Sequence, residues 1–245
     1  YANAVQDLLK LKVSVFPLPE RMMRDRSGYF NRAIKDGMPV SLTVSSRPLG
    51  KSGLIEPRLS GVGPFPQDLR AEHGYDNQAD HLSLSPLLME AFFQLSRTIV
   101  SSSTFDPKTV GIWKDFFLAP QKEEDLEKVL AARLKAFLTQ AFRRPVKKET
   151  LMRYLSHALG SLKKGASFEA TMKDVVSAVL ASPRFLYLYD SLGAEEETLS
   201  REALLASRLS FFLWGSLPDE QLLGLAQAGR LSDPKVLEGQ LDRML

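Results

Sequence analysis

Two of the chain's three histidines, His73 and His81, lie within one short polar segment. Between them stand Asp76, Asn77 and Asp80, whose oxygen atoms are the ligands that hard cations prefer. The two imidazoles suit a transition metal, and the two carboxylates are candidates for acid and base catalysis on a glycan. The spacing matches neither an EF-hand loop nor a zinc signature, and short polar side chains also build turns. A metal or catalytic site and a purely structural turn are therefore the two interpretations of this segment.

A second candidate site is basic. Arg143, Arg144, Lys147 and Lys148 form a compact cluster directly after a predicted helix. Cations at this density can bind phosphate or an acidic polysaccharide. Positive side chains also accumulate at helix C-termini because they stabilise the helix dipole. The cluster is thus a candidate anion-binding site with a structural alternative.

The sequence lacks the residues that several other chemistries need. It contains no cysteine, which excludes disulfides, thiol nucleophiles and the C-x-x-C-H attachment of haem c. Gly50, Lys51 and Ser52 resemble the end of a phosphate-binding loop, but Ser45 stands where the first glycine is required. No G-x-S-x-G motif marks a serine hydrolase. We therefore expect no cofactor within this chain.

The composition is that of a folded protein with nearly balanced charge. The 245 residues are 44% apolar, which is enough to fill real hydrophobic cores. With 32 basic against 29 acidic residues, the formal charge is only +3. Such a charge, spread over the surface, gives no reason to expect a nucleic-acid partner. No stretch reaches the roughly 18 to 20 consecutive apolar residues of a membrane-spanning helix.

Residues 1–120 are predicted to form an N-terminal helical domain with an irregular insertion at about residues 20–73. A short amphipathic helix is expected at the N-terminus, and Ser85 with Pro86 starts a longer helix. The insertion is dense in Pro and Gly, and its alternating stretch around Val40 to Val44 favours at most a short β-hairpin.

Residues 121–192 are predicted to form a three-helix bundle. Helices are expected over residues 123–142, 148–163 and 168–181, because apolar residues recur on one face of each. In the first helix the apolar stripe consists of Leu126, Leu130, Leu134, Phe137 and Ala141.

Residues 193–245 are predicted to be the truncated start of a further helical domain. Ser200 is expected to cap its first helix. The core stripe of that helix is expected to be Leu205, Leu209, Phe212 and Leu213, widened by Leu204, Phe211 and Trp214. Ser216 to Asp219 fits a capping box for the next helix, Gly229 fits its left-handed end, and Asp233 opens the last helix. The predicted fold class is mainly α, with consecutive small helical bundles.

Several stretches of the sequence, taken in order, point to one group of families. The N-terminal YANAVQDLL and the stretch from Gly74 to Pro86 come first. AFRRPV at residues 141–146 and SPRFLY at residues 182–187 follow, and then LASRLSFFLWGSLPDEQLL from Leu205. Together they resemble the planctomycete-type domains of unknown function from very large secreted proteins that often carry c-type cytochrome modules.

The resemblance implies an extracytoplasmic location, either periplasmic or secreted. It implies other domains of the same polypeptide as partners, together with a secreted protein or polysaccharide. Any haem c would belong to a module outside this chain. The resemblance supplies no catalytic residues.

Two functions follow from these observations. The first is a non-catalytic helical scaffold or interaction region of an extracytoplasmic, cytochrome-c-associated multidomain protein. The alternative is part of a glycan-acting or metal-dependent enzyme that uses the segment from His73 to His81. The absence of a complete catalytic constellation favours the scaffold.

Overall fold

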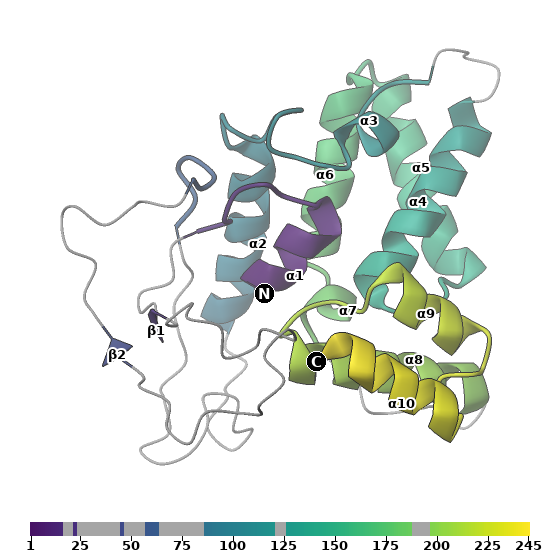
Figure 1. The fold of residues 1–245 in the computed structure, drawn as a ribbon. Helices are drawn as coiled ribbons and strands as arrows, with labels where there is room; N and C mark the ends of the chain where they lie inside the picture. The colour runs from purple at the N-terminus through teal and green to yellow at the C-terminus, as the bar shows by residue number, and fades with distance from the viewer. Residues whose placement is uncertain (17–21, 24–44, 47–56, 64–85, 121–125, 188–196) are drawn as a thin grey trace.

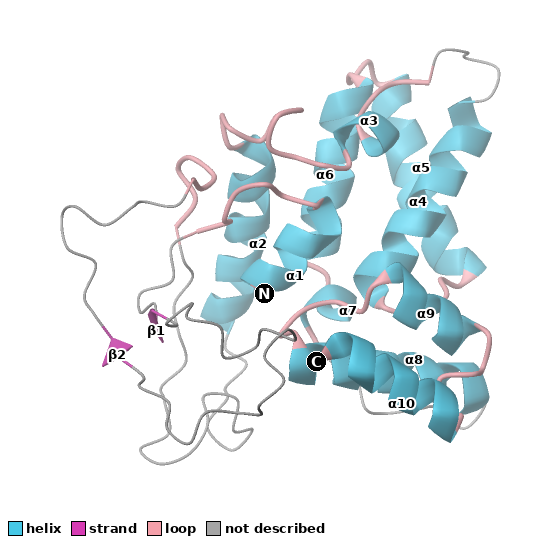
Figure 2. Ribbon diagram, viewed as in Figure 1, coloured by secondary structure: helices cyan, strands magenta, loops and turns pink. Residues whose placement is uncertain are grey.

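The computed structural model describes residues 1–16, 22–23, 45–46, 57–63, 86–120, 126–187 and 197–245 (Figure 1). These residues are mainly helical, which confirms the predicted fold class (Figure 2). The helices are α1 (Ala2–Leu9), α2 (Pro86–Ser101), α3 (Trp113–Phe116), α4 (Leu126–Phe142), α5 (Lys148–Lys163), α6 (Phe168–Leu180), α7 (Pro183–Leu186), α8 (Glu197–Leu213), α9 (Glu220–Gln227) and α10 (Pro234–Met244). None of these helices combines the length and apolarity that crossing a bilayer requires.

The predicted insertion contains a short antiparallel pair of strands, β1 (Met22–Met23) and β2 (Ser45–Ser46). Most of the insertion, including the alternating stretch before Ser45, lies outside the described residues. A described part, residues 57–63, is tied to the core. The Ser14 amide donates to the Pro57 carbonyl, and the Leu59 amide donates to the Ser14 carbonyl, both at 2.9 Å. Leu59 is thereby held fully buried.

One large hydrophobic core joins α1 to α7. Its fully buried members include Leu9 of α1, Ile99 of α2, Leu134 of α4 and Met172 of α6. The boundary predicted between residues 120 and 121 therefore does not divide the packing. Helices α4, α5 and α6 lie in the segment predicted to be a bundle, and they share one core with the helices of the N-terminal segment.

Helix α6 is the central element of this core. It packs against α5 and also, more extensively, against α2. Its buried residues lie on more than one side: Thr171, Met172, Val175, Val176, Ser177, Val179 and Leu180. Helix α5 therefore covers only part of this surface, and α2 covers another part.

A buried pair of serines marks the α2–α6 contact. The Ser96 hydroxyl donates to the Phe93 carbonyl at 2.8 Å, which leaves its oxygen free to accept from the Ser177 hydroxyl at 3.1 Å. Both side chains are small, so the two helices can approach closely. Both hydroxyls are satisfied, so burying them carries little penalty.

A second, smaller core lies between α8, α9 and α10, in the lower part of Figure 1. Its buried members are Ala206, Leu222, Ala226, Leu231 and Met244. The buried carboxylate of Glu202 on α8 accepts the Leu231 amide at 2.6 Å and the Ser232 amide at 3.2 Å. This contact fixes the turn between α9 and α10 against α8.

Three sequence predictions fail in this last segment. Helix α8 begins at Glu197, so Ser200 lies inside the helix and does not cap it. Asp219 rather than Ser216 is the N-cap of α9, because its carboxylate accepts the Leu222 amide. Phe212, predicted to be in the core, is 86% exposed, whereas its neighbour Phe211 packs against the large core.

We expect Ile99→Ala to lower the free energy of unfolding by about 2–5 kcal/mol, because it leaves a cavity in the core that α2 and α6 share. Denaturant titration followed by circular dichroism measures the loss. Leu87→Ala on the same helix is the control, since Leu87 is 68% exposed and should change stability little. Equal effects of the two substitutions would show that α2 is not part of the cooperative core.

Candidate functional site

The segment from His73 to His81, with Asp76, Asn77 and Asp80, lies outside the described residues. Its role as a metal or catalytic site therefore stays a prediction. Within the described ranges, no three His, Asp or Glu side chains gather closely enough to hold a metal ion.

The structure divides the predicted basic cluster. Arg143 follows α4 with a left-handed backbone, φ 58°, and its side chain is only 4% exposed. Its Nη1 donates to the carbonyls of Ala141 and Phe185 at 3.2 and 3.1 Å. Its Nη2 donates to the carbonyls of Arg184 and Tyr187 at 3.0 and 2.8 Å. The guanidinium also lies 5.7 Å from the Phe211 ring centroid.

Arg143 thus connects two of the stretches that carry the family resemblance. It belongs to AFRRPV, and three of its four acceptors belong to SPRFLY. Burial, and to a smaller extent the charge of Arg144, lowers the pKa of Arg143 to about 10. The guanidinium is still protonated at neutral pH, and its donors are used by the backbone. Arg143 is therefore a structural residue rather than part of an anion-binding surface.

The other three members of the cluster face outward. Arg144 is half-buried, and Lys147 and Lys148 are exposed at the start of α5. Of the four candidate anion-binding residues, these three remain accessible. They lie next to the further cations of α5.

The connection between α8 and α9 makes polar contacts with three other helices, α1, α4 and α10. We call residues 215–220 the junction segment. Its buried residues include Ser216, at 2% exposure, and Leu217, at 3%. Leu217 belongs to the large core, although the helices on either side of it build the small one. The junction segment therefore lies between the two cores.

Helix α1 contacts the junction segment from one side. The Ser216 hydroxyl donates to the Asp7 carboxylate. The Asn3 amide donates to the Gly215 carbonyl at 3.4 Å, and Lys10 forms a 3.7 Å ion pair with Glu220. The ion pair is exposed and contributes little, whereas the Ser216 contact satisfies a buried hydroxyl.

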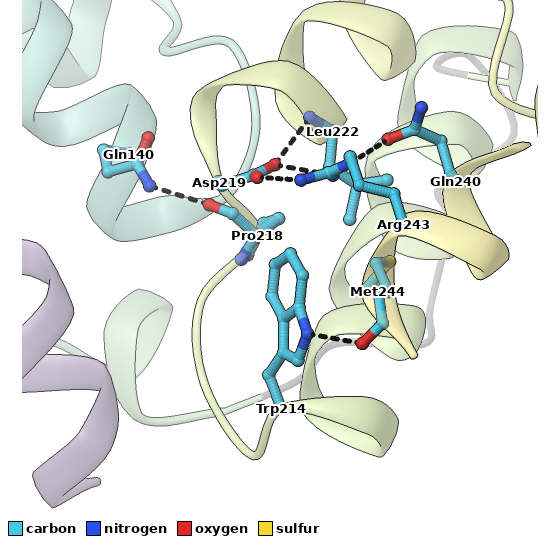
Figure 3. Close-up of polar contacts among 8 residues, drawn as sticks. All are labelled: Gln140, Trp214, Pro218, Asp219, Leu222, Gln240, Arg243 and Met244. Atoms are coloured by element: carbon cyan, nitrogen blue, oxygen red, sulfur yellow. Dashed lines mark hydrogen bonds and ion pairs between the residues drawn. The ribbon is translucent and has the colours of Figure 1, made fainter. Parts of the chain in front are cut away.

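On the other side, the junction segment contacts α4 and α10 (Figure 3). The Gln140 side-chain amide of α4 donates to the Pro218 carbonyl at 2.7 Å. Asp219, while capping α9, also accepts both terminal nitrogens of Arg243 at 2.6 and 3.2 Å. This two-point ion pair fixes the distance between α9 and α10.

Arg243 is itself held by two further groups (Figure 3). Its Nε donates to the Gln240 side chain at 2.9 Å, and its guanidinium lies 5.5 Å from the Trp214 ring centroid. The Trp214 indole N–H donates to the Met244 carbonyl at 3.1 Å. In this network Gln140, Asp219, Arg243 and Trp214 make contacts between elements, whereas the Gln240–Arg243 bond lies within α10.

Sequence reasoning identified part of the junction segment but not its role. Ser216 and Asp219 carried the signal of a capping box, and only Asp219 acts as a cap. The partner of Ser216 is Asp7, more than two hundred residues away in the sequence. No local pattern indicates such a contact.

We expect Arg143→Met to lower the free energy of unfolding by about 2–4 kcal/mol, because it leaves buried carbonyls without donors. Arg144→Met changes the half-buried neighbouring residue and should lower the free energy of unfolding by about 0.5 kcal/mol or less. Thermal and denaturant unfolding of both variants measures the difference. Similar losses for the two would refute the structural role of Arg143.

Three segments of the chain match known family models. Residues 54–104 match PSD3, a protein of unknown function (DUF1587). Residues 129–190 match PSD5, a protein of unknown function (DUF1595), and residues 201–245 match PSD4, a protein of unknown function (DUF1592). No curated protein and no solved structure matches the chain.

The three matches assign most of the helices to a family segment. Helix α2 lies in the PSD3 segment, α5 to α7 lie in the PSD5 segment, and α9 and α10 lie in the PSD4 segment. The PSD3 match begins inside the stretch at 20–73 that was predicted to be an insertion, and α1 precedes it. The chain carries PSD3, PSD5 and PSD4 segments in this order, and these are the domain families that the sequence resembled.

Proposed function

We propose that this chain is a non-catalytic helical scaffold that holds parts of a larger protein in a fixed arrangement. The observation that carries the proposal is the junction segment. It joins the PSD4 core to α1 and to α4 of the PSD5 segment through Asp7 and Gln140. A hinge between two independent domains would have few such contacts.

The use of buried charges supports the same function. Arg143 and Glu202 are buried charged residues of the described chain, and both are bound to backbone groups. Catalytic groups, in contrast, need donors or acceptors that are free to meet a substrate. These two charges instead stabilise turns and helix ends.

The proposed setting is extracytoplasmic, within a cytochrome-c-associated multidomain protein. Its support is the resemblance of the sequence, not a contact in the fold. Because the chain contains no cysteine, haem c would have to be attached to a module outside it. The scaffold would then fix the distance between that module and a partner, either a secreted protein or a polysaccharide.

The scaffold and the metal-dependent form of the alternative enzyme differ in metal content. If the chain is a scaffold, the purified protein should contain no stoichiometric metal, and Asp76→Ala and Asp80→Ala should leave the metal content unchanged. Elemental analysis after dialysis measures this. One equivalent of metal that disappears in either variant would instead support a metal-dependent enzyme.

A rigid scaffold should also unfold as one unit. The two tryptophans report on different cores, since Trp113 is buried in the large core and Trp214 packs against the small one. We expect Trp113→Phe and Trp214→Phe variants to show the same denaturant midpoint by fluorescence, because the junction segment couples the cores.

The coupling should depend on the junction contacts. In the triple variant Asn3→Ala, Asp7→Ala and Gln140→Ala, the Trp214 signal should unfold at lower denaturant than the Trp113 signal, because the small core buries fewer residues. Exposed Gln94→Ala, Asp174→Ala and Gln227→Ala form the matched control. If the Trp113 and Trp214 signals gave different denaturant midpoints in protein with an unaltered junction segment, that result would count against a rigid scaffold.

A further inference from the structure

The exposed side of α5 concentrates positive charge. Residues 144–164 contain six cationic side chains and one carboxylate, Glu149. The cations are Arg144, Lys147, Lys148, Arg153, Lys163 and Lys164. This stretch therefore carries a net charge of +5, whereas the whole chain carries +3, so the rest of the chain is net acidic.

The helix places these charges on one face. At roughly 100° per residue, Lys148, Arg153, Lys163 and Lys164 fall within about 160° of arc. The buried residues of the helix, Thr150, Leu155 and Ala158, lie on the opposite side. All four cations are exposed. We call them the α5 basic face, which follows a helix of about 24 Å.

An anion that contacts the whole α5 basic face must be long. Arg153 and Lys163 are about 15 Å apart along the helix axis, more than the Debye length of about 8 Å at physiological ionic strength, so a small anion would meet only one end of the face. The net charge of the whole chain is small because acidic residues elsewhere offset the positive charge around α5. Of the predicted basic cluster, Lys148 belongs to the face, and Arg153, Lys163 and Lys164 extend it along the helix.

We propose that the α5 basic face binds a linear acidic polysaccharide. Lysine ammonium groups act as point charges without a fixed geometry, which suits a flexible polymer with repeated anionic groups. Such a ligand requires neither a pocket nor an apolar anchor. The proposal concerns an interaction surface and does not require the chain to be a scaffold.

Three other polyanionic partners fit this face less well. The apolar side of α5 is used in the core, so it cannot insert into a membrane. Tyr154, the aromatic residue of the helix, packs against the core and offers no stacking surface to nucleic-acid bases. Met152 is an exposed apolar side chain, but it stands alone, whereas protein interfaces use clustered anchors.

The test measures binding of the whole chain to polygalacturonate and to heparin, which distinguish carboxylate from sulfate ligands, with neutral dextran as a blank. The variant Lys148→Glu, Arg153→Glu, Lys163→Glu and Lys164→Glu should bind roughly tenfold more weakly or worse at about 0.15 M salt. Glu149→Gln should bind more tightly than wild type, because it removes a repulsive carboxylate from the same face.

The control reverses the same number of exposed charges elsewhere: Lys108→Glu, Lys114→Glu, Arg230→Glu and Lys235→Glu. It should bind like wild type, and circular dichroism should show all variants folded. Equal losses in the two quadruple variants, or no binding of wild type to either polysaccharide, would overturn the proposal. Binding of duplex DNA as tight as that of the polysaccharides would also overturn it.

Discussion

A helix that is apolar on more than one side must be covered on each of those sides, and α6 imposes this constraint on the rest of the fold. Seven of its thirteen residues are buried. Two neighbours in a three-helix bundle leave part of that surface open to water, at a cost of roughly 25 cal/mol per Å². Helix α2 closes it, with the Ser96–Ser177 pair allowing close approach. The position of α2, and the large core that includes α1 and α3, follow from this requirement.

The helices themselves could be predicted from the sequence because their signals are local. Periodic apolar residues indicated α5 over 148–163, and Asp233 with Pro234 marked the start of α10. The same periodicity shows which face of a helix is buried but not what covers it. For this reason the sequence suggested a boundary at residue 120, where the structure has one continuous core. Phe211 and Phe212 were both assigned to the apolar side of α8, and only the packing shows that Phe211 contacts the core while Phe212 is exposed.

The candidate sites show the same difference between what local sequence indicates and what packing decides. The basic cluster was visible as composition, but burial of Arg143 and exposure of Lys148 depend on where α7 packs. Three of the carbonyl oxygens that accept from Arg143 belong to a stretch about forty residues later. A sequence does not indicate which backbone carbonyls will accept a hydrogen bond. The junction segment was recognised as a turn with a cap. Its contacts with Asp7 and Gln140 join residues too distant for any spacing rule.

The packing of α6, in the PSD5 segment, against α2, in the PSD3 segment, limits how such proteins can be rearranged. A PSD5 segment moved into another polypeptide without α2 would expose to water the part of the α6 surface around Ser177 that α2 covers. Recombination that separates the PSD3 segment from the PSD5 segment would therefore tend to yield aggregating products. In this protein, the two segments are best regarded as one heritable unit, and residue changes on α2 and α6 should be tolerated only in compatible pairs.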